Sequence, residues 1–131
     1  MNYFLIGLGS NIDPTENMPR ARETLSTTGT VIDQSAELIN PPCGSGFDGM
    51  FHNQLLILKS ALPERELKAK FEQIEIDMGR EPKTPQRKFN NRTIDIDILA
   101  TESSVDLCLQ TQLKDSYNQT IMSSWHPDLS N

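Results

Sequence analysis

Residues 90–100 read NNRTIDIDILA, and two kinds of side chain alternate along this stretch. Three isoleucines share one parity, whereas Asp95 and Asp97 share the other. Because successive side chains of a strand point to opposite faces, the pattern predicts a strand with two carboxylates about 7 Å apart on one face. Like charges at that spacing repel, so a metal cation or solvating water is needed to stabilise them. These residues alone leave two interpretations open, a solvated polar face and a metal site.

Three further strands are predicted from apolar runs. Residues 3–9 form a buried strand that ends in a glycine-rich turn, and residues 30–39 form a second one. Residues 51–60 are apolar on both parities in the middle, which is typical of a central strand covered on both faces. Residues 105–110 could add one more strand.

Two helices are predicted between these strands. Asp13 is a candidate cap for the first, with Pro14 at its first position and Gly29 at its end. The second covers residues 63–78, because its apolar residues recur every three or four positions and form one stripe. A weaker helix is expected over residues 115–125.

The order strand, helix, strand, strand, helix, strand predicts an α+β fold of the ferredoxin-like type. In that βαββαβ sandwich an antiparallel sheet carries both helices on one face, and extra C-terminal elements would follow here. A chain of 131 residues is long enough for one hydrophobic core but not for two, so a single domain over 1–131 is expected.

Composition narrows the classes of partner. The chain has 18 acidic and 12 basic residues and a net charge of −6, which argues against general binding to nucleic acid or to an anionic membrane. Cys43 and Cys108 have neither zinc-ligand spacing nor a disulfide framework, which suits a reducing cytoplasm. The apolar run YFLIGL, residues 3–8, is too short for a signal peptide core or a membrane span.

A basic segment precedes the Asp95/Asp97 strand. Magnesium-bound polyphosphates require carboxylates for the metal and arginine or lysine for the phosphate oxygens. The alternative is a solvated loop whose charges balance nearby acidic residues. The segment covers positions 80–92 and contains five of the 12 basic residues: Arg80, Lys83, Arg87, Lys88 and Arg92.

Three other positions favour a small-molecule site. Glu75 lies near the end of its predicted helix, where the helix dipole disfavours a carboxylate. Phe51 and Asn53 share a face at the start of their strand, so a flat heterocycle could stack on the ring and bond to the amide. Ordinary core packing of Phe51 is the alternative.

Five motifs follow one another along the chain: GLGSN at 7–11, NPP at 40–42 followed by CG, FHN at 51–53, EIDMGR at 75–80 and NRTIDIDIL at 91–99. In order and spacing they resemble the 6-hydroxymethyl-7,8-dihydropterin pyrophosphokinase family of folate biosynthesis, and the last motif is the most specific. The resemblance covers residues 3–105. It implies a cytoplasmic, monomeric enzyme that transfers pyrophosphate from ATP to the hydroxymethyl group of a reduced pterin, with two magnesium ions.

The resemblance also implies roles for individual residues. Asp95 and Asp97 would bind both metals, Arg80 and Arg92 would contact phosphates, and these four would form the catalytic set. The substrate-binding residues would be Pro42, Cys43, Gly44, Phe51, Asn53 and Phe89. The nucleotide-binding residues would be Glu75, Lys83, Arg87, Lys88 and Arg92.

The chain departs from the family pattern in two places. Pro82 replaces a second arginine, and beyond residue 105 a Pro-His segment and a nucleotide-binding arginine are missing. Tyr117 is the candidate for the second ring that stacks on the pterin. These departures leave a second hypothesis, a catalytically silent paralogue that binds a pterin or nucleotide and regulates a partner. A ferredoxin-like interaction domain without a small ligand is the third, but it leaves NRTIDIDIL unexplained.

Overall fold

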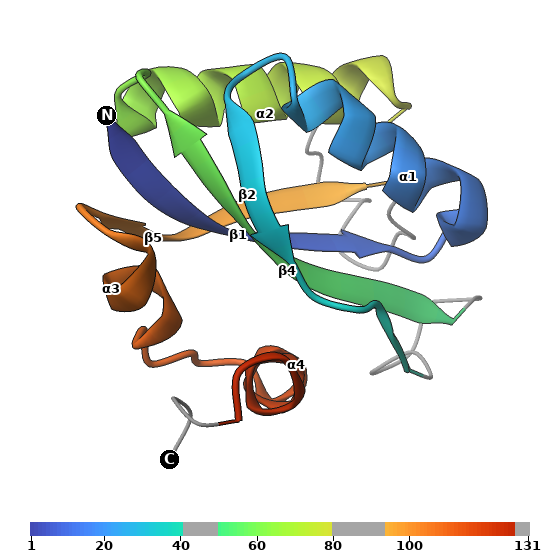
Figure 1. Cartoon of the computed structure of the whole chain (residues 1–131). Helices are drawn as coiled ribbons and strands as arrows, with labels where there is room; N and C mark the ends of the chain where they lie inside the picture. Colours follow the sequence, from blue (N-terminus) through green and yellow to red (C-terminus); the bar gives the residue numbers. More distant parts are fainter. Residues whose placement is uncertain (41–49, 80–93, 128–131) are drawn as a thin grey trace.

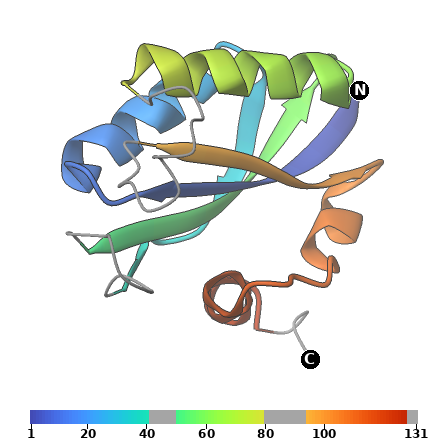
Figure 2. The same ribbon diagram turned by 180° about the vertical axis from the view of Figure 1, so that it is seen from behind.

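A five-stranded sheet forms the middle of the structure, a computed structural model that describes residues 1–40, 50–79 and 94–127. Helices α1 and α2 cover one face, and α3 and α4 lie on the other (Figures 1 and 2). In chain order the elements are β1 (Asn2–Ser10), α1 (Pro14–Leu25), β2 (Thr30–Gln34), β3 (Leu38–Asn40), β4 (Phe51–Ser60), α2 (Glu64–Asp77), β5 (Asp95–Glu102), α3 (Val105–Leu109) and α4 (Ser116–Trp125).

The strand order is β2-β4-β1-β5, with β3 also paired to β4, and every pair is antiparallel. The two central strands are β1 and β4, and β1 pairs along its full length with β4, from Asn2 opposite Ser60 to Ser10 opposite His52. This order, with the two long helices on one face, confirms the predicted ferredoxin-like α+β fold. No helix in the described ranges is long and apolar enough to cross a membrane.

The strand predicted over residues 30–39 is divided into β2 and β3 by Ser35. Its backbone N–H donates to the carbonyl of Leu55 at 2.9 Å, and its hydroxyl accepts from the N–H of Leu55 at 3.0 Å. The same hydroxyl donates to the carbonyl of Ala36. A serine side chain thus replaces one backbone bond of the ladder, which bends the chain between the two strands.

The further strand that residues 105–110 could have added does not form. Residues 105–109 form helix α3 instead, and the Ser104 side chain caps it by accepting from the N–H of Leu107 at 3.2 Å. The prediction of a helix over residues 115–125 is confirmed by α4.

The ends of α1 differ in detail from the prediction. Asp13 occupies the cap position, but its carbonyl, rather than its side chain, accepts the N–H groups of Glu16 and Asn17. The helix ends at Leu25, four residues before Gly29. A Cβ at Gly29 would lie 2.4 Å from the carbonyl oxygen of Lys59, so close backbone approach, not helix termination, explains this glycine.

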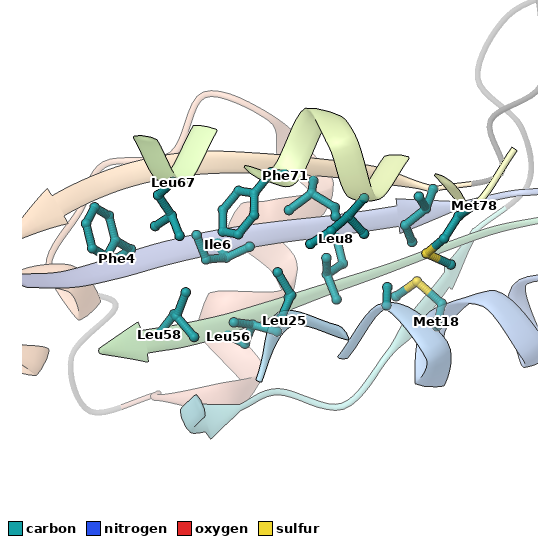
Figure 3. Close-up of a cluster of buried hydrophobic side chains, with 14 residues drawn as sticks. Phe4, Ile6, Leu8, Met18, Leu25, Leu56, Leu58, Leu67, Phe71 and Met78 are labelled. Atoms are coloured by element: carbon teal, nitrogen blue, oxygen red, sulfur yellow. The ribbon is translucent and has the colours of Figure 1, made fainter. Parts of the chain in front are cut away.

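Two hydrophobic clusters lie on the two faces of the sheet, and β1 and β4 contribute to both. Figure 3 shows the first cluster, in which the apolar stripe of α2 packs on the sheet as predicted. The covering of both faces confirms that residues 51–60 form a central strand. The first cluster includes Phe4, Ile6, Leu8, Met18, Leu25, Leu56, Leu58, Leu67, Phe71 and Met78. The second includes Leu5, Leu55, Ile57, Cys108, Leu109, Ile121 and Met122, with the half-buried Trp125 against it.

Candidate active site

Two glycines of β1 lie between the predicted pterin-binding and metal-binding residues. Gly9 is opposite Asn53 of β4 on one side and opposite Asp95 of β5 on the other. Gly7 is likewise opposite Asp97. Because residues directly opposite in an antiparallel pair point to the same face, the amide and both carboxylates share one face of the sheet. It is the face on which α3 and α4 lie (Figure 1).

Gly7 and Gly9 add no side chains of their own here, so a strip of glycine backbone, bordered by the Asn53 amide and the Leu99 side chain, lies between Asn53 and the aspartates. Asn53 and Asp95 are separated by two strand spacings, about 10 Å, across Gly9. A Cβ at Gly9 would lie 2.9 Å from Oδ1 of Asn53, so the amide extends over the glycine. A ligand on this strip can therefore reach the amide at one side and the carboxylates at the other.

Phe51 lies at the start of β4, on the same face as Asn53. It is half-buried and belongs to neither hydrophobic cluster of the described residues. The ring and the amide stand next to each other at one border of the strip.

Asp95 and Asp97 form the opposite border. Asp95, the first residue of β5, is half-buried, and Asp97 is exposed. Hard divalent cations such as magnesium prefer oxygen ligands of this kind, so the pair fits the metals that the sequence implies. Within the described ranges, no group of three or more histidine, cysteine or acidic residues is placed to hold a metal ion, so the fit rests on this pair.

Glu75 contacts the backbone of β5. Its side chain is buried, and its Oε2 accepts the N–H of Ile96, the residue between the two aspartates, at 2.7 Å. The sequence predicted a nucleotide contact for Glu75, and its strand contact was not foreseen, because the two residues are 21 positions apart.

Tyr117, near the start of α4, lies close enough to Asp95 and Asp97 for their charges to affect its phenol. Burial raises the pKa of its phenol to about 12, and the charge and hydrogen bond of Asp115 and the charges of Asp97 and Asp95 contribute. The phenol donates to Oδ2 of Asp115 at 3.2 Å. Helix α4 thus brings an aromatic ring to the side of the site opposite the sheet.

A polar network that sequence analysis missed holds β4 from the other face. Glu37 accepts from Nη1 of Arg22 at 3.1 Å and pairs with Nδ1 of His52 at 2.9 Å. Arg22 also donates to Oε1 of Gln54 at 2.9 Å. His52 and Gln54 alternate with Phe51 and Asn53 along β4, so the network fixes the backbone that carries them. Its members come from α1, β4 and the connection between β2 and β3, and no local pattern connects them.

Of the predicted site residues, the structure brings together Phe51, Asn53, Asp95 and Asp97 and adds Tyr117 to them. Nine other predicted site residues lie outside the described ranges: Pro42, Cys43, Gly44, Arg80, Lys83, Arg87, Lys88, Phe89 and Arg92.

A comparison with known families shows which family the chain belongs to. The sequence model of the family described as 7,8-dihydro-6-hydroxymethylpterin-pyrophosphokinase (HPPK) matches residues 5–123. No curated protein matches the chain. The family match extends beyond the expected limit at residue 105, through α3 and most of α4, and therefore includes Tyr117. Since the match covers most of the 131 residues, the chain belongs to the 7,8-dihydro-6-hydroxymethylpterin-pyrophosphokinase family.

Proposed function

We propose that this protein transfers pyrophosphate from ATP to the hydroxymethyl group of 6-hydroxymethyl-7,8-dihydropterin, giving the pterin diphosphate and AMP. Family membership supports a pterin pyrophosphokinase function in folate biosynthesis. The observation that carries the specific proposal is the row Asn53, Gly9, Asp95 across three strands. In this row an amide that could bond to a heterocycle and a carboxylate that could bind a metal ion lie on one face, with glycine backbone between them.

The pterin would lie at the β4 side of the strip. Asn53 would bond to the edge of the heterocycle, since an amide offers both a donor and an acceptor. Phe51 would stack on one face of the ring system, and Tyr117 from α4 would cover the other. The backbone at Pro42, Cys43 and Gly44 and the ring of Phe89 would complete this pocket.

The nucleotide would lie at the β5 side. Asp95 and Asp97 would hold two magnesium ions, which when bound neutralise the charge of the phosphates. Arg80 and Arg92 would contact phosphate oxygens, and Glu75 was predicted to take part in nucleotide binding. Lys83, Arg87 and Lys88 would provide further positive charge, although a lysine does not replace the two-pronged contact of an arginine.

Catalysis in such a site would consist mainly of positioning and charge neutralisation. The hydroxymethyl oxygen would form a bond to the β-phosphorus of ATP as the bond to the oxygen of AMP breaks, and the hydroxyl proton would pass to solvent. The two borders of the strip would hold the reactants so that these atoms meet between Asn53 and the aspartates. A cytoplasmic monomer remains our expectation for the working form.

One observation favours the alternative of a silent paralogue that binds a pterin or nucleotide and regulates a partner. Tyr117 experiences the charges of Asp95, Asp97 and Asp115 together. Three carboxylates in one region oppose the binding of a polyphosphate unless cations neutralise them. A pterin-only binder would tolerate this charge and would show no magnesium-dependent affinity for ATP.

The proposal is tested by measuring AMP formation from ATP with magnesium and the dihydropterin. We expect AMP only when pterin is present, and a loss of roughly a hundredfold or more in Asp97→Ala. Asp106→Ala, at an exposed position of α3, is the matched control and should keep the activity of the parent. Equal rates for Asp97→Ala and the parent would exclude the assignment. A folded parent that binds pterin but forms no AMP would support the silent paralogue.

A further inference from the structure

The carboxylate of Glu75 is an unusual partner for a strand. Its side chain projects from the last turn of α2, only 4% of the residue is exposed, and its Oε2 lies 2.7 Å from the amide nitrogen of Ile96. Burying a carboxylate is unfavourable unless hydrogen bonds compensate for its lost hydration. The contact with β5 is therefore a specific interaction at a buried position and not a mobile surface contact.

The position of this bond along β5 is informative. β5 is an outermost strand of the sheet, and Ile96 is its second residue. Since the N–H of Ile96 donates to Glu75, this N–H points away from β1. The residues on either side, Asp95 and Asp97, are opposite Gly9 and Gly7 of β1. Strand ends and sheet edges open most readily, and the carboxylate pair lies at such an end.

A second carboxylate of α2 contacts the same strand further along. Thr101 donates its hydroxyl proton to Oε1 of Glu64, in the first turn of the helix. The two glutamates are 11 positions apart on a helix, about 16 Å, and Ile96 and Thr101 are five positions apart on a strand, also about 16 Å. The matching lengths allow one rigid helix to hold β5 at two points. Only the Glu75 contact lies at the aspartates.

We infer that Glu75 is a positioning residue for metal binding. It holds the start of β5 through Ile96, and thereby fixes the spacing and direction of Asp95 and Asp97. This inference rests on the proposed function, because it assumes that the two aspartates bind the metal ions. It assigns Glu75 to the support of the metal ligands, in place of the direct nucleotide contact predicted from the sequence.

The test is the affinity of the full chain for Mn²⁺, used as a paramagnetic probe for magnesium, together with a non-hydrolysable ATP analogue. Glu75→Met has a similar volume but accepts no hydrogen bond, and we expect its Mn²⁺ affinity to fall about tenfold to a hundredfold. Glu75→Gln retains an acceptor oxygen and should stay within about threefold of the parent. Pterin affinity should remain unchanged in both variants, since neither alters β4.

Glu64→Ala is the matched control, because it removes the other carboxylate contact between α2 and β5. Its Mn²⁺ affinity should equal that of the parent. Hydrogen exchange of the Ile96 amide gives a readout independent of metal, and it should be faster in Glu75→Met but not in Glu64→Ala. If Glu75→Met does not fold, Glu75→Asp replaces it, because it keeps the charge but is one methylene too short to reach Ile96.

The possible results separate the inference from the proposed function. Parent-like Mn²⁺ affinity in Glu75→Met would overturn the positioning role and leave the pyrophosphokinase proposal intact. Equally weak binding in Glu75→Gln and Glu75→Met would also overturn it, because charge rather than the hydrogen bond would then be responsible. A parent that binds no Mn²⁺ with the ATP analogue would overturn the metal site and the role of Glu75 together.

Discussion

At the scale of single residues, Gly9 determines how the two borders of the site meet. It lies between Asn53 and Asp95, and the amide oxygen of Asn53 occupies the space that a Cβ would need. A substitution here therefore changes the orientation of the amide before it changes anything else. Gly7, in the next row, faces the flexible end of the Leu99 side chain. A Cβ at Gly7 would lie 3.2 Å from Cδ1 of Leu99, which has more freedom to adjust.

Gly9→Ala should weaken pterin binding while the protein stays folded. The new methyl group would lie 2.9 Å from Oδ1 of Asn53 and displace the amide, so we expect a loss of roughly fivefold in pterin affinity, the value of about one hydrogen bond. Fluorescence titration with the dihydropterin measures it. Gly7→Ala serves as the comparison and should have a smaller effect. An unchanged affinity in Gly9→Ala would mean that Asn53 does not bind the pterin.

Tyr117 provides a pH-dependent signal from the same site. Its pKa is raised from the ordinary 10.0 to about 12, chiefly by burial and then by Asp115. The unfolded chain therefore releases this proton near pH 10, whereas the folded chain retains it until about pH 12. Folding stability contributed by the neutral phenol is complete below pH 10 and is lost as the pH rises towards 12.

We therefore expect Tyr117→Phe to lose less stability than the parent between pH 10 and pH 12. Urea unfolding midpoints at several pH values across this range measure the difference. Phenolate absorbance provides a second check, since Asp115→Asn should move the titration of Tyr117 towards its ordinary range. Parallel pH profiles for the parent and Tyr117→Phe would contradict the raised pKa.

At the scale of elements, α4 depends on the sheet for its stability. It has ten residues, too few for an isolated helix to be stable in water, and packs Ile121 and Met122 against Leu55 and its neighbours. The same helix carries Tyr117 to the candidate site. Packing of its apolar side and placement of the aromatic ring are therefore coupled.

Ile121→Ala should destabilise the protein by about 2–5 kcal/mol, because it leaves a cavity between α4 and the sheet. The melting temperature should fall by about 4 °C for each kcal/mol. Calorimetry measures this change, with the exposed Ser123→Ala on the same helix as the control. Pterin affinity should fall as well, because Tyr117 loses its support. A stability equal to that of the parent would show that α4 is not docked as described.

At the scale of the whole molecule, the two hydrophobic clusters share their strands. Leu5 and Ile6 are neighbours on β1 but point into different clusters, and Leu55 and Leu56 do the same on β4. Loss of either cluster exposes one face of both central strands. The domain is therefore expected to unfold as one cooperative unit.

Phe71→Ala, in the first cluster, should lower the free energy of unfolding by about 3–5 kcal/mol. Trp125 is the single tryptophan and lies against the second cluster, so its fluorescence reports on the opposite face. We expect its unfolding transition to coincide with that of far-UV circular dichroism in both the parent and Phe71→Ala. Separate transitions would show that α3 and α4 detach before the sheet unfolds.

The sequence by itself determined the order of the main strands and helices along the chain, the central strand at 51–60 and the apolar stripe of α2. It also determined that Asp95 and Asp97 point to the same face of their strand. These features follow from side-chain periodicity, which is local. The sequence also pointed to the family, through motifs that the family match confirms over residues 5–123.

Only the tertiary structure decided which distant residues meet. It broke the strand at Ser35, turned residues 105–109 into a helix capped by Ser104, and joined Glu75 to Ile96 across 21 positions. It also placed Gly9 between Asn53 and Asp95. Hydrogen bonds and close approaches between separate elements depend on strand register and helix packing, and a periodic pattern within one segment contains no information about either.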